Sequence, residues 1–212
     1  ATIDFDDVSH KGITNISTDD VAVAQELGYV IKLVGDVREV ESGISAEVSP
    51  TFLPKNHPLA SVNDVMNAVF VESIGIGESM YYGPGAGQKP TATSVLADII
   101  RIARRLSDGN VGKPFNEFRR DLPLANPADV KSNYYFALDT PDEKGKILHL
   151  SEIFNSEDIS FEQVLQQKAN GTTARIVVIT HAMSKTQLQA VTEKLEAAED
   201  FTVVNTLKVL SN

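Results

Sequence analysis

The chain has 212 residues, of which 42% are hydrophobic and 23% are charged, so it has enough apolar material to bury a sizeable core. Its formal net charge of −10 offers no basic surface to nucleic-acid phosphates, and the absence of cysteine excludes disulfides, thiolate metal sites and cysteine nucleophiles. Because no apolar run is long enough for a membrane helix and no signal peptide is evident, we expect a cytoplasmic protein with neither nucleic-acid nor membrane partners.

The first half of the chain predicts one short helix followed by several strands. Ser17, Asp19 and Asp20 supply capping oxygens and early acidic residues for a helix that should end before Gly28. Four runs rich in β-branched or aromatic residues then follow, separated by turn residues: 29–40, 43–53, 68–73 and 78–83. We predict a mostly antiparallel sheet from them.

A glycine-rich loop, Gly83-Pro84-Gly85-Ala86-Gly87, joins the last of these strands to a long amphipathic helix. Apolar residues recur at helical spacing from Thr91 to Leu106, which predicts a helix packed on a sheet. The loop lacks the spacing and the βαβ setting of the dinucleotide fingerprint. The pattern alone therefore leaves two readings, a plain tight turn or a loop whose backbone approaches a ligand.

The second half of the chain follows a segment rich in Gly, Pro, Asn and Asp, which we interpret as a linker over 107–131. The pattern after it predicts strands over 134–140, 160–168, 174–181 and 201–210 and helices over 146–156 and 185–198. Their order, βαββαβ, is that of a ferredoxin-like unit with two helices on one face of an antiparallel sheet. The predicted fold class is α+β, with domains at 1–106 and 132–212.

Residues that could carry chemistry are few. The four histidines have no metal-ligand spacing, and we expect His57, in a proline-bracketed loop, to be structural or solvent-exposed. Asp4, Asp6 and Asp7 are expected to be a solvated start or a helix cap. No nucleophile elbow, phosphate-binding loop or zinc-binding helix motif occurs, so no metal site is predicted.

Three blocks of the sequence together resemble the homoserine dehydrogenase family. They are "KGITNISTDDVAVAQELGYVIKL", "PTFLPKNHPLASVNDVMNAVFVES" and "YYGPGAGQKPTATSVLADIIRIAR", at 11–33, 50–73 and 81–104. The chain is similar to the C-terminal half of that family's catalytic region, and 132–212 resembles an ACT regulatory domain. The abrupt start at Ala1 also favours a fragment.

The resemblance implies reversible reduction of aspartate 4-semialdehyde to homoserine with NADP or NAD, in threonine and methionine biosynthesis. In the family, the nucleotide-binding domain, the substrate carboxylates and the catalytic lysine precede the block that matches Ala1. We therefore assign no catalytic residue here, and Lys11 lies beyond that lysine's place. The family's glycine loop approaches the nicotinamide, so the resemblance implies cofactor contacts at Gly87, Ala86, Gly85 and Gly83.

The resemblance also implies partners. The family's counterpart of 50–73 joins two subunits, so we expect a homodimer or larger homo-oligomer. Domains of the ACT family bind small amino acids near the first strand–helix loop, so the resemblance implies an amino-acid effector, with threonine expected, at Asp142, Lys144, Gly145, Lys146 and Ile147. A connecting turn without a ligand is the alternative for that loop.

Two functions remain open from the sequence. The chain is either part of a homoserine dehydrogenase, inactive on its own, or a stand-alone amino-acid-binding module without catalysis.

Overall fold

The computed structural model describes residues 3–110, 120–167 and 172–210. The chain forms two compact units, a main unit of residues 1–55 and 120–212 and a hairpin unit of residues 56–119. Residues 111–119 of the predicted linker lie outside the described residues.

The main unit begins with a short helix and a long hairpin. After η1 (Phe5–Asp7) and β1 (Ser9–His10) come α1 (Thr18–Glu26) and the antiparallel pair β2 (Tyr29–Val40) and β3 (Gly43–Pro54). A capping box between Ser17 and Asp20 starts α1, and Gly28, with φ of 86°, reverses the chain after it. The helix and its two end signals are as the sequence predicts.

The rest of the main unit is the predicted βαββαβ arrangement. Its elements are β6 (Lys131–Pro141), α3 (Lys146–Asn155), β7 (Phe161–Gln167), β8 (Thr173–Thr180), the two-residue β9 (Met183–Ser184), α4 (Lys185–Ala197) and β10 (Thr202–Val209). The four long strands lie antiparallel in the order β10-β6-β8-β7. This topology confirms the predicted α+β fold class.

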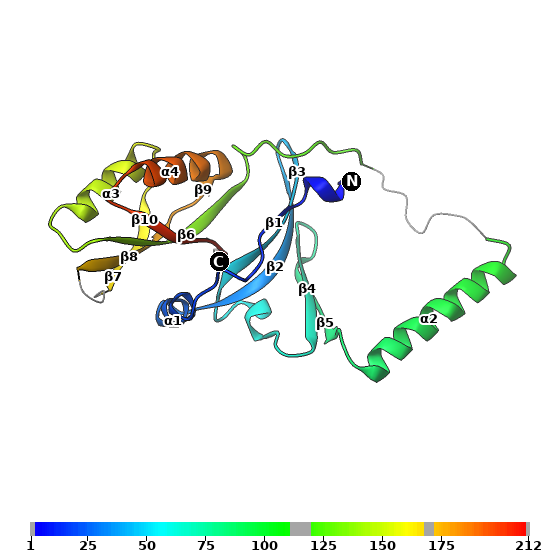
Figure 1. Ribbon diagram of the computed structural model, residues 1–212. Coiled ribbons are helices and arrows are strands. Elements are labelled where there is room, and N and C mark those ends of the chain that lie inside the picture. The colour runs from blue at the N-terminus through cyan, green and yellow to red at the C-terminus, as the bar shows by residue number, and fades with distance from the viewer. Residues whose placement is uncertain (1–2, 111–119, 168–171, 211–212) are drawn as a thin grey trace. The chain divides into compact units, whose positions relative to one another are not determined.

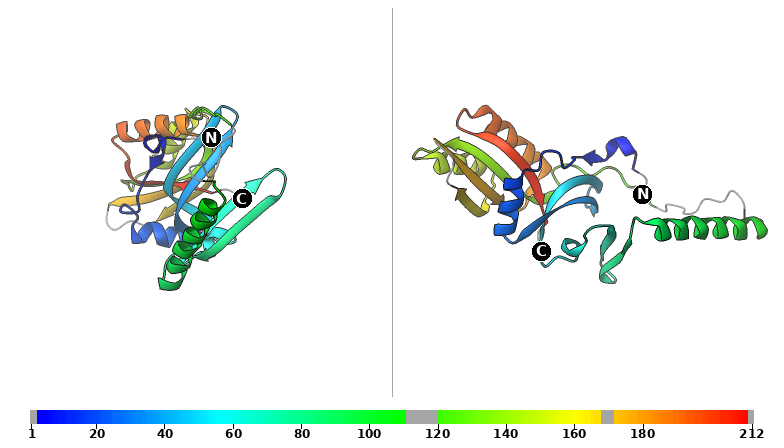
Figure 2. Two further views of the ribbon diagram at one scale, coloured as in Figure 1. Left: turned by 90° about the vertical axis from the view of Figure 1, so that its right-hand side faces the viewer. Right: turned by 60° about the horizontal axis from the view of Figure 1, so that its bottom comes forward.

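Helices cover both faces of this sheet. Phe136, Leu138 and Ile176 face the helices α3 and α4, where Leu150 and Leu195 complete one core. Alternate residues of the same strands, including Tyr135 and Val177, form a second core with α1. Figure 1 shows α3 and α4 above the sheet and α1 below it, and both views in Figure 2 agree.

The long hairpin and the ferredoxin-like strands form one continuous sheet. β3 is paired with β2 along one edge, and its other edge is shared by β1 and β10, both parallel to it. The seam between β3 and β10 aligns Lys208 with Thr51 and Val209 with Phe52, and Leu210 N–H donates to Phe52 O at 2.9 Å. The Phe52 ring stacks on Tyr135 with centroids 4.5 Å apart.

At this seam, a buried ionic cluster lies on the face of the sheet opposite to the Phe52–Tyr135 stack. Lys208, only 6% exposed, contacts both Asp36 of β2 and Glu47 of β3. Lys185, the first residue of α4, binds Glu47 at 2.8 Å, and Arg38 binds Asp36 at 2.8 Å. Burial alone would raise the pKa values of Asp36 and Glu47, but these cations outweigh it and lower both pKa values.

The hairpin unit holds η2 (Pro58–Ser61), the antiparallel pair β4 (Met66–Ser73) and β5 (Gly77–Pro84), and α2 (Gln88–Ser107). The prediction that α2 packs on a sheet is wrong for this chain. Apolar side chains of its stripe are more than two-fifths exposed, and none of its residues is buried. The stripe is amphipathic in sequence, but no element within the described residues buries it.

The predicted domain boundaries differ from the boundaries of the compact units. The sequence places boundaries at 107–131, whereas residues 1–55 share a sheet and a core with 120–212 in the structure. The division into 1–106 and 132–212 stays a proposal about sequence modules. In three dimensions the ferredoxin-like strands share their α1-side core with the first 55 residues.

Asp20 should make the main unit sensitive to acid. Its side chain, 1% exposed, accepts hydrogen bonds from Ser17, from the Tyr135 hydroxyl and from Asn205. Burial would raise its pKa, but these donors lower it. Because the folded-state pKa lies below the unfolded value of about 3.9, this stabilisation is present above that pH and is lost as the pH falls through the folded pKa.

We therefore predict that Asp20→Asn lowers the free energy of unfolding at neutral pH by about 2–4 kcal/mol, since one amide oxygen cannot accept from all these donors. Urea denaturation measures this, and the difference from wild type should shrink below about pH 4. Asp19→Asn, on the exposed side of the same helix, is the control and should cost less than about 1 kcal/mol. Equal losses for both variants would contradict the role given to Asp20.

Candidate functional site

The glycine loop lies at a junction between a strand and a helix. β5 ends at Pro84, Gly85 to Gly87 form the bend, and α2 begins at Gln88. Gly87 is the N-cap of α2, and its carbonyl accepts from Thr91 N–H. The three bend residues are exposed, so their backbone and the free N–H groups of the first helical turn are accessible to an anion or a polar ring.

Two of the glycines are required by local geometry. Gly87 has φ of 122° and ψ of 153°, a conformation that is largely restricted to glycine. A Cβ on Gly85 would lie 1.6 Å from Asn67 Nδ2, so that side chain occupies the space. Gly83 differs, since a Cβ there meets nothing within 4 Å. A plain tight turn explains the glycine at position 85. Because the loop backbone is exposed, the alternative that it contacts a ligand stays open.

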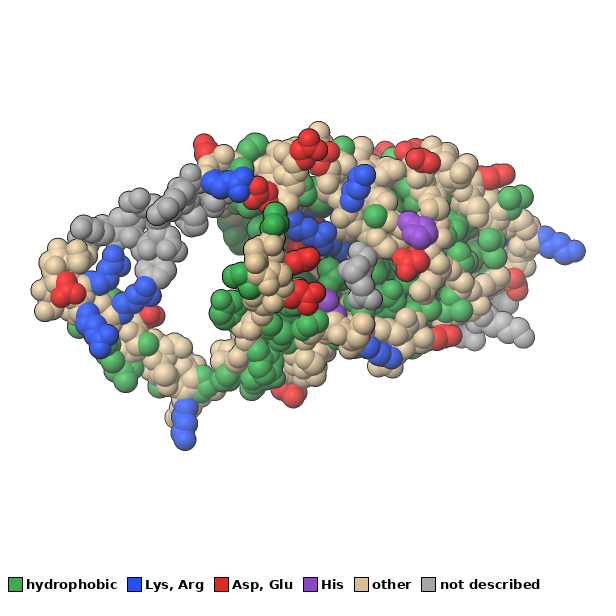
Figure 3. All heavy atoms as spheres, turned by 180° about the vertical axis from the view of Figure 1, so that it is seen from behind, with side chains coloured by type: hydrophobic (Ala, Val, Ile, Leu, Met, Phe, Trp, Pro, Cys, Tyr) green, Lys and Arg blue, Asp and Glu red, His purple; other side chains and the backbone are tan. Residues whose placement is uncertain are grey.

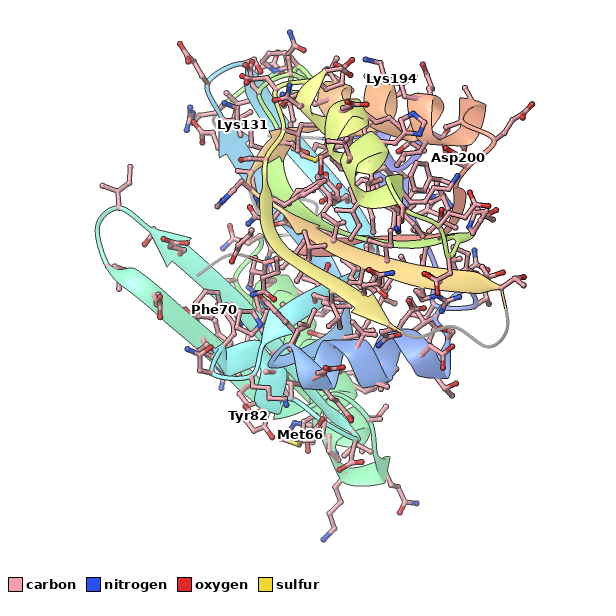
Figure 4. All side chains as sticks on the ribbon, turned by 90° about the vertical axis from the view of Figure 1, so that its left-hand side faces the viewer. Met66, Phe70, Tyr82, Lys131, Lys194 and Asp200 are labelled. Atoms are coloured by element: carbon pink, nitrogen blue, oxygen red, sulfur yellow. The ribbon has the colours of Figure 1, made fainter. Side chains whose placement is uncertain are left out.

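The hairpin unit exposes a large amount of apolar surface beside this loop. The exposed apolar residues of β4, β5 and their turn are Val69, Val71, Ile74, Ile76, Tyr81 and Tyr82, and those of α2 are Val95, Leu96, Ile99, Ile100, Ile102 and Leu106. Figure 3 shows apolar side chains uncovered on α2 next to its basic ones, and Figure 4 shows Tyr82 and Phe70 on the hairpin. Surfaces of this kind mark contacts with another protein part.

His57 and Asp4 are the N-cap residues of the short helices η2 and η1, and only the His57 side chain makes a capping hydrogen bond. His57 Nδ1 accepts from Leu59 N–H at 3.2 Å at the start of η2, and its ring packs edge-on against Phe70. Lys11 donates to Thr206 O at 2.7 Å. No group of three or more potential metal ligands occurs within residues 3–110, 120–167 and 172–210.

The predicted effector loop lies at the start of α3. Gly145, with φ of 91°, is the N-cap residue, and Asp142 and Lys144 are exposed while Ile147 is 41% exposed. Lys146 is already engaged, because its ammonium binds Asp200 at 2.7 Å and Glu143 at 3.4 Å. The structure thus leaves the loop backbone accessible but places the Lys146 charge on Asp200, which is labelled in Figure 4.

Three residues next to this loop were not found from the sequence. Thr140 is 2% exposed, and its hydroxyl has no hydrogen-bond partner among the described residues. Strand alternation places it on the same face of β6 as Leu138, the face that α3 covers. His149 Nδ1 lies 2.9 Å from Asp200, and Lys146 and His149 lower the pKa of Asp200. Thr140 and His149 lie within five positions of Gly145 in the sequence, whereas Asp200 is brought to the loop only by its contacts with Lys146 and His149.

Among the described residues, none of the helices is both long enough and apolar enough to span a membrane.

Comparison with known sequences gives consistent matches. The model of the family described as homoserine dehydrogenase matches residues 1–100. The homoserine dehydrogenase of Lactococcus lactis is 58% identical over 211 residues, covering 100% of this chain and 49% of that protein. The Bacillus subtilis homoserine dehydrogenase is 34% identical, covering 93% of this chain and 46% of that protein. The chain therefore spans about half the length of these relatives.

Comparison with solved structures agrees. A homoserine dehydrogenase from Thiobacillus denitrificans superposes with a TM-score of 0.87 at 30% identity, covering 98% of this chain and 48% of that one. One from Staphylococcus aureus, at 25% identity, gives a TM-score of 0.67 and covers 100% of this chain and 49% of that one. Over nearly its whole length, the chain is thus similar to proteins described as homoserine dehydrogenases.

Proposed function

We propose that this chain supplies the C-terminal half of a homoserine dehydrogenase that interconverts aspartate 4-semialdehyde and homoserine with NADP or NAD. The observation that carries the proposal is the end-to-end match to relatives of that name, of which the chain covers about half. The exposed stripe of α2 supports the proposal. An amphipathic helix of 20 residues with no buried residue is expected to pack its apolar face against another part of the enzyme.

The glycine loop fits a contact with one end of the cofactor. Exposed backbone at Gly85 to Gly87, followed by the free N–H groups of α2, suits the polar rim of a nicotinamide ring. The bound cofactor would supply hydride to the aldehyde carbon, and an acid would supply the proton to its oxygen. Gly83 to Gly87 would hold the cofactor by backbone contact, while the nucleotide and the catalytic acid require groups outside this chain.

The hairpin unit is proposed to join two copies of the enzyme. Residues 50–73 include β4, whose Val69 and Val71 are 61% and 42% exposed. Tyr81 and Tyr82 of the paired strand β5 add aromatic surface, which is enriched at protein interfaces. A two-fold dimer would bury these residues in pairs.

The ferredoxin-like strands are proposed to act as an ACT regulatory module that binds a small amino acid, with threonine as the expected effector. The exposed N–H groups at Gly145 would donate hydrogen bonds to its carboxylate, as a helix N-terminus favours an anion. The unpaired hydroxyl of Thr140 supplies a polar group beneath the same loop. Asp142, Lys144 and Ile147 would line the outer side.

The second function, a stand-alone amino-acid-binding module without catalysis, would rely on the same loop. It differs in one respect, because it leaves the exposed stripe of α2 without a role. The two functions are therefore separated by whether the chain restores an active enzyme.

A joined protein tests the main proposal. The part of the Lactococcus lactis enzyme that precedes the matched region is fused to Ala1 of this chain, and loss of NADPH absorbance is followed with aspartate semialdehyde. At 58% identity the surfaces should be compatible, so we predict turnover by the joined protein and none by this chain alone. A folded joined protein without activity, or turnover by the chain alone, would contradict the proposal.

Two glycine variants of the joined protein are the matched controls for the loop. Gly87→Ala forces a side chain into a glycine-only conformation, which costs about 1–3 kcal/mol and should lower kcat/KM about tenfold or more. Gly12→Ala, which lies outside the loop, adds a methyl group to open space and should stay within about twofold of wild type. If the two variants behave alike, the cofactor role of the loop is wrong.

Thr140→Val tests the effector site in the unmodified chain. Removing an unpaired buried hydroxyl should raise the free energy of unfolding by about 1 kcal/mol. Thermal denaturation with threonine, methionine and homoserine should show stabilisation of the wild type by at least one of them and a smaller stabilisation of Thr140→Val. If no amino acid stabilises the wild type, the effector proposal fails, whatever the joined protein does.

A further inference from the structure

A cleft in the main unit lies away from both the glycine loop and the effector loop. It opens where α1 ends, between Leu27 and Gly28 on one side and the last residues of β10 on the other. Its volume is about 410 Å³, at the small end of the range for ligand sites. It lies on the α1 face of the sheet, because Asn133 and Val209 are aligned neighbours and Val209 belongs to the core under α1.

One end of the cleft is polar and negative. The Asn133 side chain, 7% exposed, donates to Glu162 Oε2 at 2.9 Å and so fixes the carboxylate at the cleft wall. The Glu162 side chain is itself exposed, and Tyr29 lines the cleft beside it. Burial and the charge of Glu162 raise the pKa of Tyr29, which keeps that phenol neutral and able to donate or accept a hydrogen bond.

The Glu162 carboxylate makes this end of the cleft favourable for a cation. α1 also ends at the cleft mouth formed by Leu27 and Gly28, but the Lys55 ammonium already donates to Gln25 O there at 2.8 Å and neutralises much of the helix dipole. None of the residues that line the cleft is a lysine or an arginine. A metal ion is a poor fit, since the described residues contain no group of three potential ligands and Glu162 provides the only carboxylate of the lining.

The other end of the cleft is apolar. Leu27, Pro54, Val209 and Leu210 line it, and Pro54 and Val209 are buried. A ligand that satisfies both ends carries a compact positive group and a short aliphatic chain. An ammonium group matches a single carboxylate with neighbouring amide and phenol oxygens, because it donates three hydrogen bonds from one centre.

We propose that this cleft binds a small primary ammonium compound with a short aliphatic tail, its nitrogen at Glu162, Asn133 and Tyr29. The proposal does not rest on the proposed dehydrogenase or effector functions, because none of these residues belongs to either loop. The Glu162 carboxylate accepts the ammonium, and the tail lies on Leu27 and Val209.

The test is a titration of the full chain with n-butylammonium chloride, followed by ¹H–¹⁵N NMR. We expect saturable shifts at the Gly28 amide and the Asn133 side-chain NH₂, and at least about tenfold weaker binding of n-butanol, which has the same tail and no charge. Absence of saturable shifts at these groups, or equal binding of n-butanol, would overturn the proposal.

Two variants complete the test. Glu162→Gln removes the charge but keeps an oxygen that can accept from Asn133, so the fold should hold and the affinity should fall about tenfold or more. Glu196→Gln makes the same change on the exposed face of α4 and should leave affinity within about twofold. Equal effects of the two variants would show only general attraction to an acidic protein. An unchanged melting temperature of Glu162→Gln verifies that its weaker binding is local.

Discussion

The parallel seam between β3 and β10 is the constraint on which the main unit depends. Only two aligned residue pairs form it, yet it converts a hairpin and a ferredoxin-like sheet into one sheet. Phe52 and Tyr135 stack on one side, and on the other side Lys208 is buried between Asp36 and Glu47. A buried lysine is tolerated only with carboxylates in close contact, so the ionic cluster fixes how β10, β2 and β3 meet.

The ionic cluster at the seam connects α4 to the β2–β3 hairpin. α4 begins at Lys185, which binds Glu47, so the helices next to the effector loop and the long hairpin share one charged cluster. A ligand that shifted α3 and α4 against the sheet would act on the hairpin without an intervening linker. The candidate effector loop and the β2–β3 hairpin thus belong to one packed body, whereas the glycine loop belongs to the hairpin unit.

Much of this fold could be predicted from local sequence, and the reasons are specific. Ser17, Asp20 and Gly28 define α1 by capping chemistry, which depends on neighbours within one turn. The periodicity of 134–210 gives the βαββαβ order for the same reason. The β3–β10 seam could not be predicted, because it pairs residues more than 150 positions apart through two short contacts.

The candidate sites, like the fold, could be predicted only in part from the sequence. The glycines at 85 and 87 stand out in sequence, and the structure gives Gly87 a conformation that requires glycine. Asp200 is an ordinary residue in the sequence, and only folding brings it near Gly145, while the burial of the Thr140 hydroxyl without a partner among the described residues is visible only in the structure. The stripe of α2 was correctly predicted as one apolar face, but sequence periodicity does not reveal whether the covering partner is in the same chain.

Hydrogen–deuterium exchange by mass spectrometry tests the central claim most directly, in this chain and in the protein joined to the preceding half of the Lactococcus lactis enzyme. The account predicts that β3, β6 and β10 exchange together through one cooperative opening in both proteins. It predicts that α2 exchanges fast in the chain alone and becomes protected in the joined protein. Independent opening of β3 and β10, or an α2 already protected in the chain alone, would contradict it.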